Sequence, residues 1–140
     1  MKIEIGESLI YSWLRHIKQC QIVEINWKSS PRWQTESVDL DSMKKDIENE
    51  FKDSGLDIFH KNNSISQLLQ QAEIDVVGLS IDSVHDERVY HFVDVAFHES
   101  GLNYGSKEET ISRVLEKFIR SYFLYLSYFN DNSPAMVSIP

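Results

Sequence analysis

The feature that most constrains this chain is a pair of neighbouring strand-like segments in which acidic residues sit among apolar ones. Residues 73–78 and 89–99 are rich in β-branched and aromatic side chains, and a polar turn over residues 82–88 separates them. Asp75 and Asp94 lie inside these segments. An ionised carboxylate is costly to bury, so such acids need a partner, a shifted pKa or a shared metal ion. The pattern predicts a hairpin that brings the two acids together, and a divalent-metal site is the first hypothesis.

The length and composition of the chain are those of one ordinary soluble domain. With 140 residues, of which 41% are hydrophobic, the chain can bury a core without disulfides. No apolar run is long enough to cross a bilayer, and the first residues lack the features of a secretory signal. We therefore expect a single cytoplasmic domain over residues 1–140. Cys20 is the only cysteine, which excludes an internal disulfide, and we expect it to be a small core residue.

The formal net charge of -8 opposes a nucleic-acid partner. Proteins that hold nucleic acid usually carry a basic face, because neutralisation of phosphates supplies much of the affinity. The acidic excess is concentrated in residues 39–53, where a solvated acidic face is the simplest explanation. A local basic surface remains compatible with the composition, because several basic residues gather later in the chain: Lys107, Arg113, Lys117 and Arg120.

Hydrophobic periodicity predicts helices that alternate with strands along the chain. The predicted helices lie around residues 9–17, 39–52, 64–69 and 106–126, and the predicted strands at 21–27, 73–78, 89–99 and 135–139. The last strand should run parallel to the strand of Asp94, because strand, helix, strand forms a crossover unit. The chain ends directly after it, so we expect that a natural C-terminal portion is missing.

Two of the predicted helices carry more specific patterns. Ser64 and Ser106 each open a capping box. The longest helix should pack on the sheet through one apolar stripe, which consists of Ile111, Val114, Leu115, Phe118, Ile119, Tyr122 and Leu126.

The order of elements and motifs carries a family resemblance. A helix with Gly6-Glu7 at its start is followed by Glu73-Ile74-Asp75 in one strand and Asp94-Val95-Ala96 in the next, and then by a helix and a strand. This order resembles the restriction-endonuclease-like PD-(D/E)xK nuclease superfamily, nearest to its small Holliday-junction-resolvase-like members. The resemblance implies an α/β fold with a three-layer core, in which a mixed central sheet is flanked by helices.

The resemblance also implies an activity and a set of site residues. It implies metal-dependent hydrolysis of DNA phosphodiester bonds, with Asp75 and Asp94 as ligands of Mg²⁺ or Mn²⁺ and Glu7 as an outer or third ligand. Mg²⁺ takes oxygen ligands, commonly one or two carboxylates with water and phosphate, and such an ion lowers the pKa of a bound water. DNA is then the expected partner, and a homodimer is implied because a duplex has two strands.

One position departs from the family pattern. The third residue of the second motif is lysine in the family, where it activates the attacking water and offsets phosphate charge, whereas Ala96 stands there in this chain. Strand alternation places His98 on the same face as Asp94, so His98 is one candidate to act as the base. Lys107, on the following helix, is the other candidate.

Alternatives stay open for both the site and the function. Asp75 and Asp94 could discourage aggregation at a strand edge, or form ion pairs with Arg88 or Arg113. The chain could also be a catalytically inactive module that keeps the nuclease fold for interaction with protein or nucleic acid, which the acidic charge and Ala96 both favour. Carboxylates gathered around an open cleft would favour the enzyme, and an arginine bonded between them would favour the module.

Overall fold

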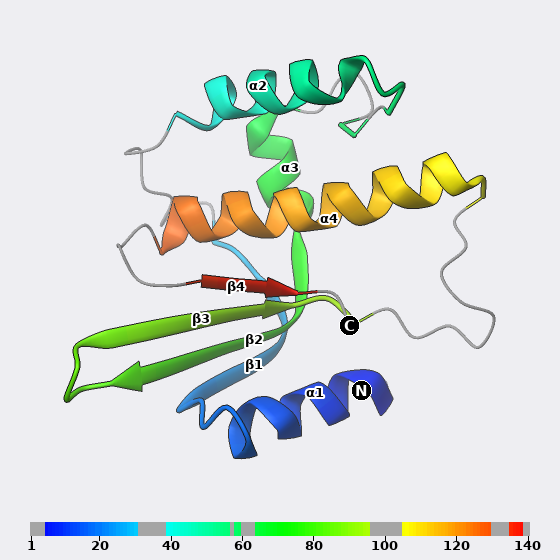
Figure 1. Ribbon diagram of the computed structural model, residues 1–140. Helices are drawn as coiled ribbons and strands as arrows, with labels where there is room; N and C mark the ends of the chain where they lie inside the picture. The colour runs from blue at the N-terminus through cyan, green and yellow to red at the C-terminus, as the bar shows by residue number, and fades with distance from the viewer. Residues whose placement is uncertain are drawn as a thin grey trace. The chain divides into compact units, whose positions relative to one another are not determined.

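The computed structural model describes residues 5–30, 39–56, 58–59, 64–95, 105–129 and 135–138, and helices and strands both occur in this part of the chain (Figure 1). The helices are α1 (Ile5–His16), α2 (Leu40–Lys52), α3 (Ile65–Gln71) and α4 (Lys107–Tyr128), and the strands are β1 (Ile22–Lys28), β2 (Glu73–Asp82), β3 (Glu87–Val93) and β4 (Ala135–Ser138). The protein is mixed α/β, and every predicted helix and strand has a counterpart. None of the described helices is both long and apolar enough to cross a membrane.

The described strands form one mixed sheet in the order β1-β2-β3-β4 (Figure 1). β1 pairs antiparallel with β2, and β2 pairs antiparallel with β3. β4 runs parallel to β3, which confirms the prediction for the last strand. The two acidic segments therefore form neighbouring central strands, as the hairpin pattern predicts.

The chain divides into two compact units, each assembled from separate stretches. Residues 1–28, 73–97 and 131–140 form the sheet unit, which holds α1 and the described strands. Residues 29–72 and 98–130 form the helical unit, which holds α2, α3 and α4. Because each unit is completed only by residues far apart in the sequence, a truncation in the middle of the chain removes part of both.

The core of the sheet unit lies between α1 and one face of the sheet. Leu14 of α1 and Cys20 are buried together with Val76 and Val93. Cys20 is thus a small core residue, as predicted, and burial raises the pKa of its thiol.

Two apolar residues of the segment predicted as the first helix are not part of the core. Leu9 and Ile17 are 67% and 68% exposed. Leu9 is rotated by about 140° around the helix from the buried Leu14, since each residue turns about 100°. Ile17 follows the last helical residue, and Gln19, with a φ of 55°, turns the chain toward β1.

The core of the helical unit contains a stacked pair of aromatic rings. The rings of Phe59 and Phe123 have centroids 6.4 Å apart and lie nearly parallel, and the ammonium of Lys44 lies 5.2 Å from the Phe59 centroid. Leu68 of α3 and Leu124 of α4 are fully buried in this unit. The unit is therefore held together by apolar contacts between short and long helices that are distant in sequence.

Helix α4 begins as predicted but buries a different side. The side chain of Ser106 accepts the N–H of Glu109, and the Glu109 carboxylate accepts the N–H of Ser106, which completes the capping box. Ile111 and Tyr122 of the predicted stripe are exposed, whereas the buried residues include Ser112, Glu116, Phe123, Leu124 and Ser127. Glu116 tolerates burial because Arg120, one turn later, is its ion-pair partner.

The β2–β3 hairpin is longer and tighter than predicted. β2 continues to Asp82, and the turn occupies only residues 83–86. The Asp82 carboxylate accepts the backbone N–H groups of Val84 and His85 at 3.0 and 3.3 Å, which fixes the turn. β3 ends at Val93, so Asp94 directly follows the strand, whereas it was predicted to lie inside it.

We predict that Gly78→Ala destabilises the sheet unit. A Cβ at this position would lie 3.0 Å from Cys20 Sγ and 3.1 Å from a Leu14 Cδ, so these buried side chains must move by a few tenths of an ångström. We expect a loss of about 1–3 kcal/mol in the free energy of unfolding, measured by urea denaturation. Ser80→Ala, two residues along the same strand, is the control and should cost less. Equal losses in the two variants would contradict the close approach of α1 at Gly78.

We predict a second, pH-dependent effect at His91, which is 3% exposed and whose Nδ1 has no hydrogen-bond partner among the described residues. Burial lowers the pKa of His91, and the charge of Lys18 lowers it further. His91 therefore binds a proton at a higher pH in the unfolded chain than in the folded protein. The free energy of unfolding then falls as the pH drops below about 6.5, with a slope that approaches about 1.4 kcal/mol per pH unit.

The measurement is the free energy of unfolding at pH 7.5 and at pH 5.5. His91→Leu should reduce the difference between the two values, while His85→Gln, in the exposed turn, should retain it. A His91→Leu protein as acid-sensitive as the wild type would assign the effect to other groups.

Candidate functional site

Asp75 and Asp94 both lie at the end of the β2–β3 ladder. The last pair of the ladder is Val76 with Val93, and Asp75 and Asp94 are the residues next to this pair on the two segments. The Oδ2 atom of Asp75 accepts the backbone N–H of Val95 at 2.7 Å, so this carboxylate spans from β2 to the chain just beyond β3. Asp94 is only 7% exposed, and Asp75 is half-buried. Both acids therefore lie at the same end of the sheet unit.

Asp75 lies on the face of the sheet that carries the ion pair between Lys28 and Glu73. Lys28 and Glu73 are opposite each other in the register, and Lys28 Nζ lies 3.2 Å from Glu73 Oε2. Side chains two residues apart on a strand share a face, so Asp75 lies on the face of Glu73, and Asn26 on the face of Lys28. We call the group Asn26, Lys28, Glu73, Asp75 and Asp94 the polar end of the sheet.

Asn26 is a member of the polar end that sequence reasoning missed. The register pairs Ile25 with Val76 and Trp27 with Ile74, so Asn26 lies opposite Asp75. Its φ of 53° is in the left-handed region, which Asn tolerates better than most residues. An Asn in an otherwise β-branched and charged strand was the available signal. The backbone of the edge strand is therefore locally irregular beside Asp75.

Glu7 lies on a different side of the sheet. It occupies the first turn of α1, where a carboxylate is favourable to the helix dipole. α1 packs through Leu14 on Val76 and Val93, and Val76 points to the face opposite that of its neighbour Asp75. Among the described residues, no three His, Cys, Asp or Glu side chains gather into a group that could hold a metal ion. The role of Glu7 as an outer or third ligand stays a prediction.

The two residues predicted to replace the family lysine lie outside the described part of the sheet unit. His98 lies outside the described residues, as does Ala96. Lys107 is the exposed first residue of α4 and belongs to the helical unit, whereas Asp75 and Asp94 belong to the sheet unit.

The predicted ion pair of these acids with Arg88 is not formed. Arg88 is opposite Ile81 in the register, six residues along β2 from Asp75, which corresponds to about 20 Å along a strand. An arginine side chain does not reach over that distance. The other predicted partner, Arg113, lies on α4 in the helical unit.

The donor set at Asp75 and Asp94 consists of oxygen atoms. Two carboxylates with water and phosphate form a common Mg²⁺ ligand set, and the Val95 carbonyl is a further oxygen close by. A carboxylate has about four lone-pair positions, so the hydrogen bond from Val95 does not prevent Asp75 from binding a cation. The pair fits a hard divalent ion that keeps several non-protein ligands.

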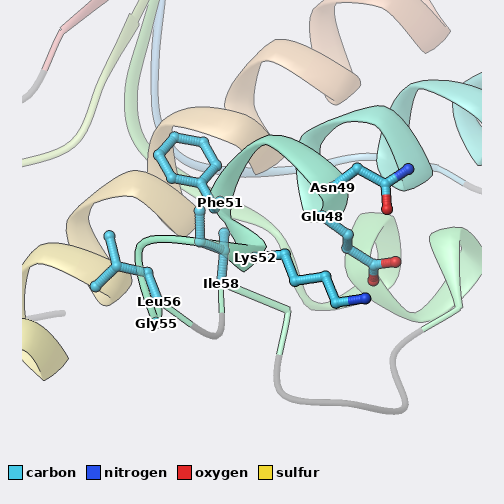
Figure 2. A pocket seen from close by; sticks show the side chains of 7 residues that line it. All are labelled: Glu48, Asn49, Phe51, Lys52, Gly55, Leu56 and Ile58. Atoms are coloured by element: carbon cyan, nitrogen blue, oxygen red, sulfur yellow. The ribbon is translucent and has the colours of Figure 1, made fainter.

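The helical unit contains a cavity of about 520 Å³ at the C-terminal end of α2 (Figure 2). It is lined by Glu48, Asn49, Phe51, Lys52, Gly55, Leu56 and Ile58. Figure 2 shows Glu48 and Lys52 extending to one side of α2, and Phe51 to the other. Glu48 forms an ion pair with Lys44, whose Nζ lies 2.9 Å from Glu48 Oε1. This cavity contains none of the predicted site residues.

Comparisons with protein-family models, curated proteins and solved structures found no match for this chain. With no relative to compare, the geometry of the polar end is the basis for a functional proposal.

We predict that Asp75 has a structural role that can be separated from its charge. Asp75→Ala leaves the half-buried N–H of Val95 without this acceptor, so we expect a loss of about 1–2 kcal/mol in the free energy of unfolding. Asp75→Asn keeps a carbonyl oxygen as acceptor and should lose clearly less. Urea denaturation of both variants is the measurement. Identical stabilities would show that the Val95 hydrogen bond contributes nothing.

Proposed function

We propose that this protein is a divalent-metal-dependent phosphodiesterase that acts on DNA, with Asp75 and Asp94 holding Mg²⁺ or Mn²⁺. The observation that supports the proposal is that both acids lie at the end of the β2–β3 ladder, where Asp75 Oδ2 accepts the N–H of Val95, the residue after Asp94. Two acids on adjacent strands with oxygen donors around them form a ligand set suited to a hard cation.

The order of the elements supports the same proposal. α1 is followed by the antiparallel strands β1, β2 and β3, then by α4 and by β4, which runs parallel to β3. The two acids lie on β2 and just after β3, which is the order on which the resemblance to the PD-(D/E)xK superfamily rests. α2 and α3 are an insertion between β1 and β2. Membership of that superfamily is part of the proposal.

The chain's own residues prepare the site in two ways. The Val95 N–H holds the Asp75 carboxylate in one orientation, and the burial of Asp94 restricts its side chain. Such restriction lowers the cost of assembling a ligand set around an ion. When bound, the ion would supply a water of lowered pKa and positive charge at the phosphate.

A second candidate function is a catalytically inactive interaction module. The observation that favours it is that Asp75 already has a structural use, as the acceptor of the Val95 N–H, in a part of the chain where the described residues form no three-ligand group. Ala96 at the lysine position agrees with this candidate.

The test is a titration of Mn²⁺ into the wild type and Asp94→Asn, followed by water-proton relaxation, with cleavage of single-stranded, duplex and branched DNA measured in the same samples. We expect Asp94→Asn to weaken Mn²⁺ binding at least tenfold and to abolish cleavage, because it removes one of two charged ligands. Glu87→Gln makes the same change in charge at the turn end of β3, opposite Asp82 and far along the ladder from Asp75, and should leave both unchanged.

The outcomes separate the two candidate functions. Binding and cleavage lost together in Asp94→Asn support the nuclease. Wild-type binding without cleavage of any of the DNA forms favours the inactive module. A wild type that does not bind Mn²⁺ contradicts the proposed site.

A further inference from the structure

We infer that Lys28 is the cation that contacts the DNA phosphate at the Asp75–Asp94 pair. This inference rests on the proposed function and names a residue that the sequence motifs do not contain. Three features support this role: the charge of the polar end, the position of Lys28, and the exposed ion pair between Lys28 and Glu73.

The polar end needs a positive charge in order to accept a phosphodiester. The polar end contains the carboxylates of Glu73, Asp75 and Asp94, and Glu24 lies on the same face of β1 as Lys28. A divalent ion offsets two negative charges, which leaves a net negative field toward an anionic substrate. The chain as a whole, with a formal charge of -8, adds to this repulsion.

Lys28 is close to the acid pair although it is distant in sequence. It is opposite Glu73 on the neighbouring strand, and Asp75 is the next residue of β2 on the same face. Diagonal neighbours of this kind have Cα atoms about 7–8 Å apart, a distance that a lysine side chain spans. A phosphate bound beside Asp75 would therefore lie within reach of the Lys28 ammonium.

The ion pair between Lys28 and Glu73 leaves the Lys28 ammonium able to bind a ligand. The side chains of Lys28 and Glu73 are 64% and 40% exposed, and the two atoms are 3.2 Å apart. Exposed ion pairs contribute little to stability, so exchanging Glu73 for a phosphate oxygen costs little. A phosphate that bridges Lys28 and the cation of the acid pair would gain from both charges.

Other basic residues of the sheet unit, within its described part, lie elsewhere. Arg88 is about 20 Å along the strand from Asp75. Arg15 donates to Tyr11 on α1, and Lys18 lies 5.1 Å from the centroid of the Trp13 ring. α1 covers the face opposite the polar end, so these two cations are on the wrong side of the sheet.

The experiment compares Lys28→Met with Lys45→Met, a matched change of charge on the exposed side of α2. We expect Lys28→Met to reduce Mn²⁺-dependent DNA cleavage at least tenfold, while Mn²⁺ affinity and the thermal unfolding midpoint stay at wild-type values. The slope of log affinity for DNA against log salt should fall in magnitude by about 0.7–0.9, the value for one lost phosphate contact. Lys45→Met should change none of these quantities.

A second pair of variants tests the role of the charge itself. Lys28→Arg should retain most of the salt slope, because the positive charge is kept. Glu73→Gln should retain or increase DNA affinity, because it releases Lys28 and removes a negative charge.

The inference and the proposed function fail in different ways. If the wild type binds Mn²⁺ and cleaves DNA while Lys28→Met behaves as Lys45→Met does, the role of Lys28 is overturned and the nuclease stands. If the wild type neither binds Mn²⁺ nor cleaves DNA, the proposed function is overturned, and the role of Lys28 with it.

Discussion

The antiparallel pairing of β2 with β3 is the interaction on which the rest of the sheet unit depends. Its register runs without interruption from Asp82–Glu87 to Val76–Val93. A slip by one residue would turn every side chain of one strand to the other face. The same register places Gly78 opposite His91, where α1 approaches closely, and it ends directly before Asp75 and Asp94. Packing on one face and charge on the other are thus set by one ladder.

The two faces of β2 meet different demands. Val76 and Gly78 accept the buried side of α1, and the absence of a side chain at Gly78 makes room for Cys20 and Leu14. Glu73 and Asp75 alternate with these residues and carry the charge. Alternation along a single strand therefore lets one segment hold both an apolar contact and an acidic site, which explains acids in an otherwise apolar run.

Local patterns in the sequence predict the elements well, because helix periodicity, capping boxes and strand alternation depend on nearby residues. Ser106 is an example, since its capping box is complete within four residues. The pairing of β2 with β3 was also predictable, because a short turn connects the two strands. The end of β3 at Val93, which leaves Asp94 outside the strand, was not predictable, because it depends on where the pairing with β2 stops.

The remaining features depend on contacts between distant residues. The pairing of Lys28 with Glu73 joins positions separated by the whole insertion of α2 and α3, and no local pattern encodes that register. For the same reason Asn26 and Lys28 were absent from the predicted site. The difference between the predicted and the observed buried side of α4 has another cause. A hydrophobic pattern counts Glu116 as a surface residue, but its ion pair with Arg120 allows the side of the helix that carries Glu116 to be buried.

The two candidate functions differ in how the carboxylate of Asp75 is used. As an acceptor for Val95 alone, it would simply close the end of the hairpin beyond the last ladder pair. A serine, threonine or asparagine can accept the same N–H, so this use does not require a charge. It also does not account for the second carboxylate, that of Asp94, which directly follows β3 at the same end of the sheet. A shared cation would use both acids, which is why the nuclease is the preferred proposal.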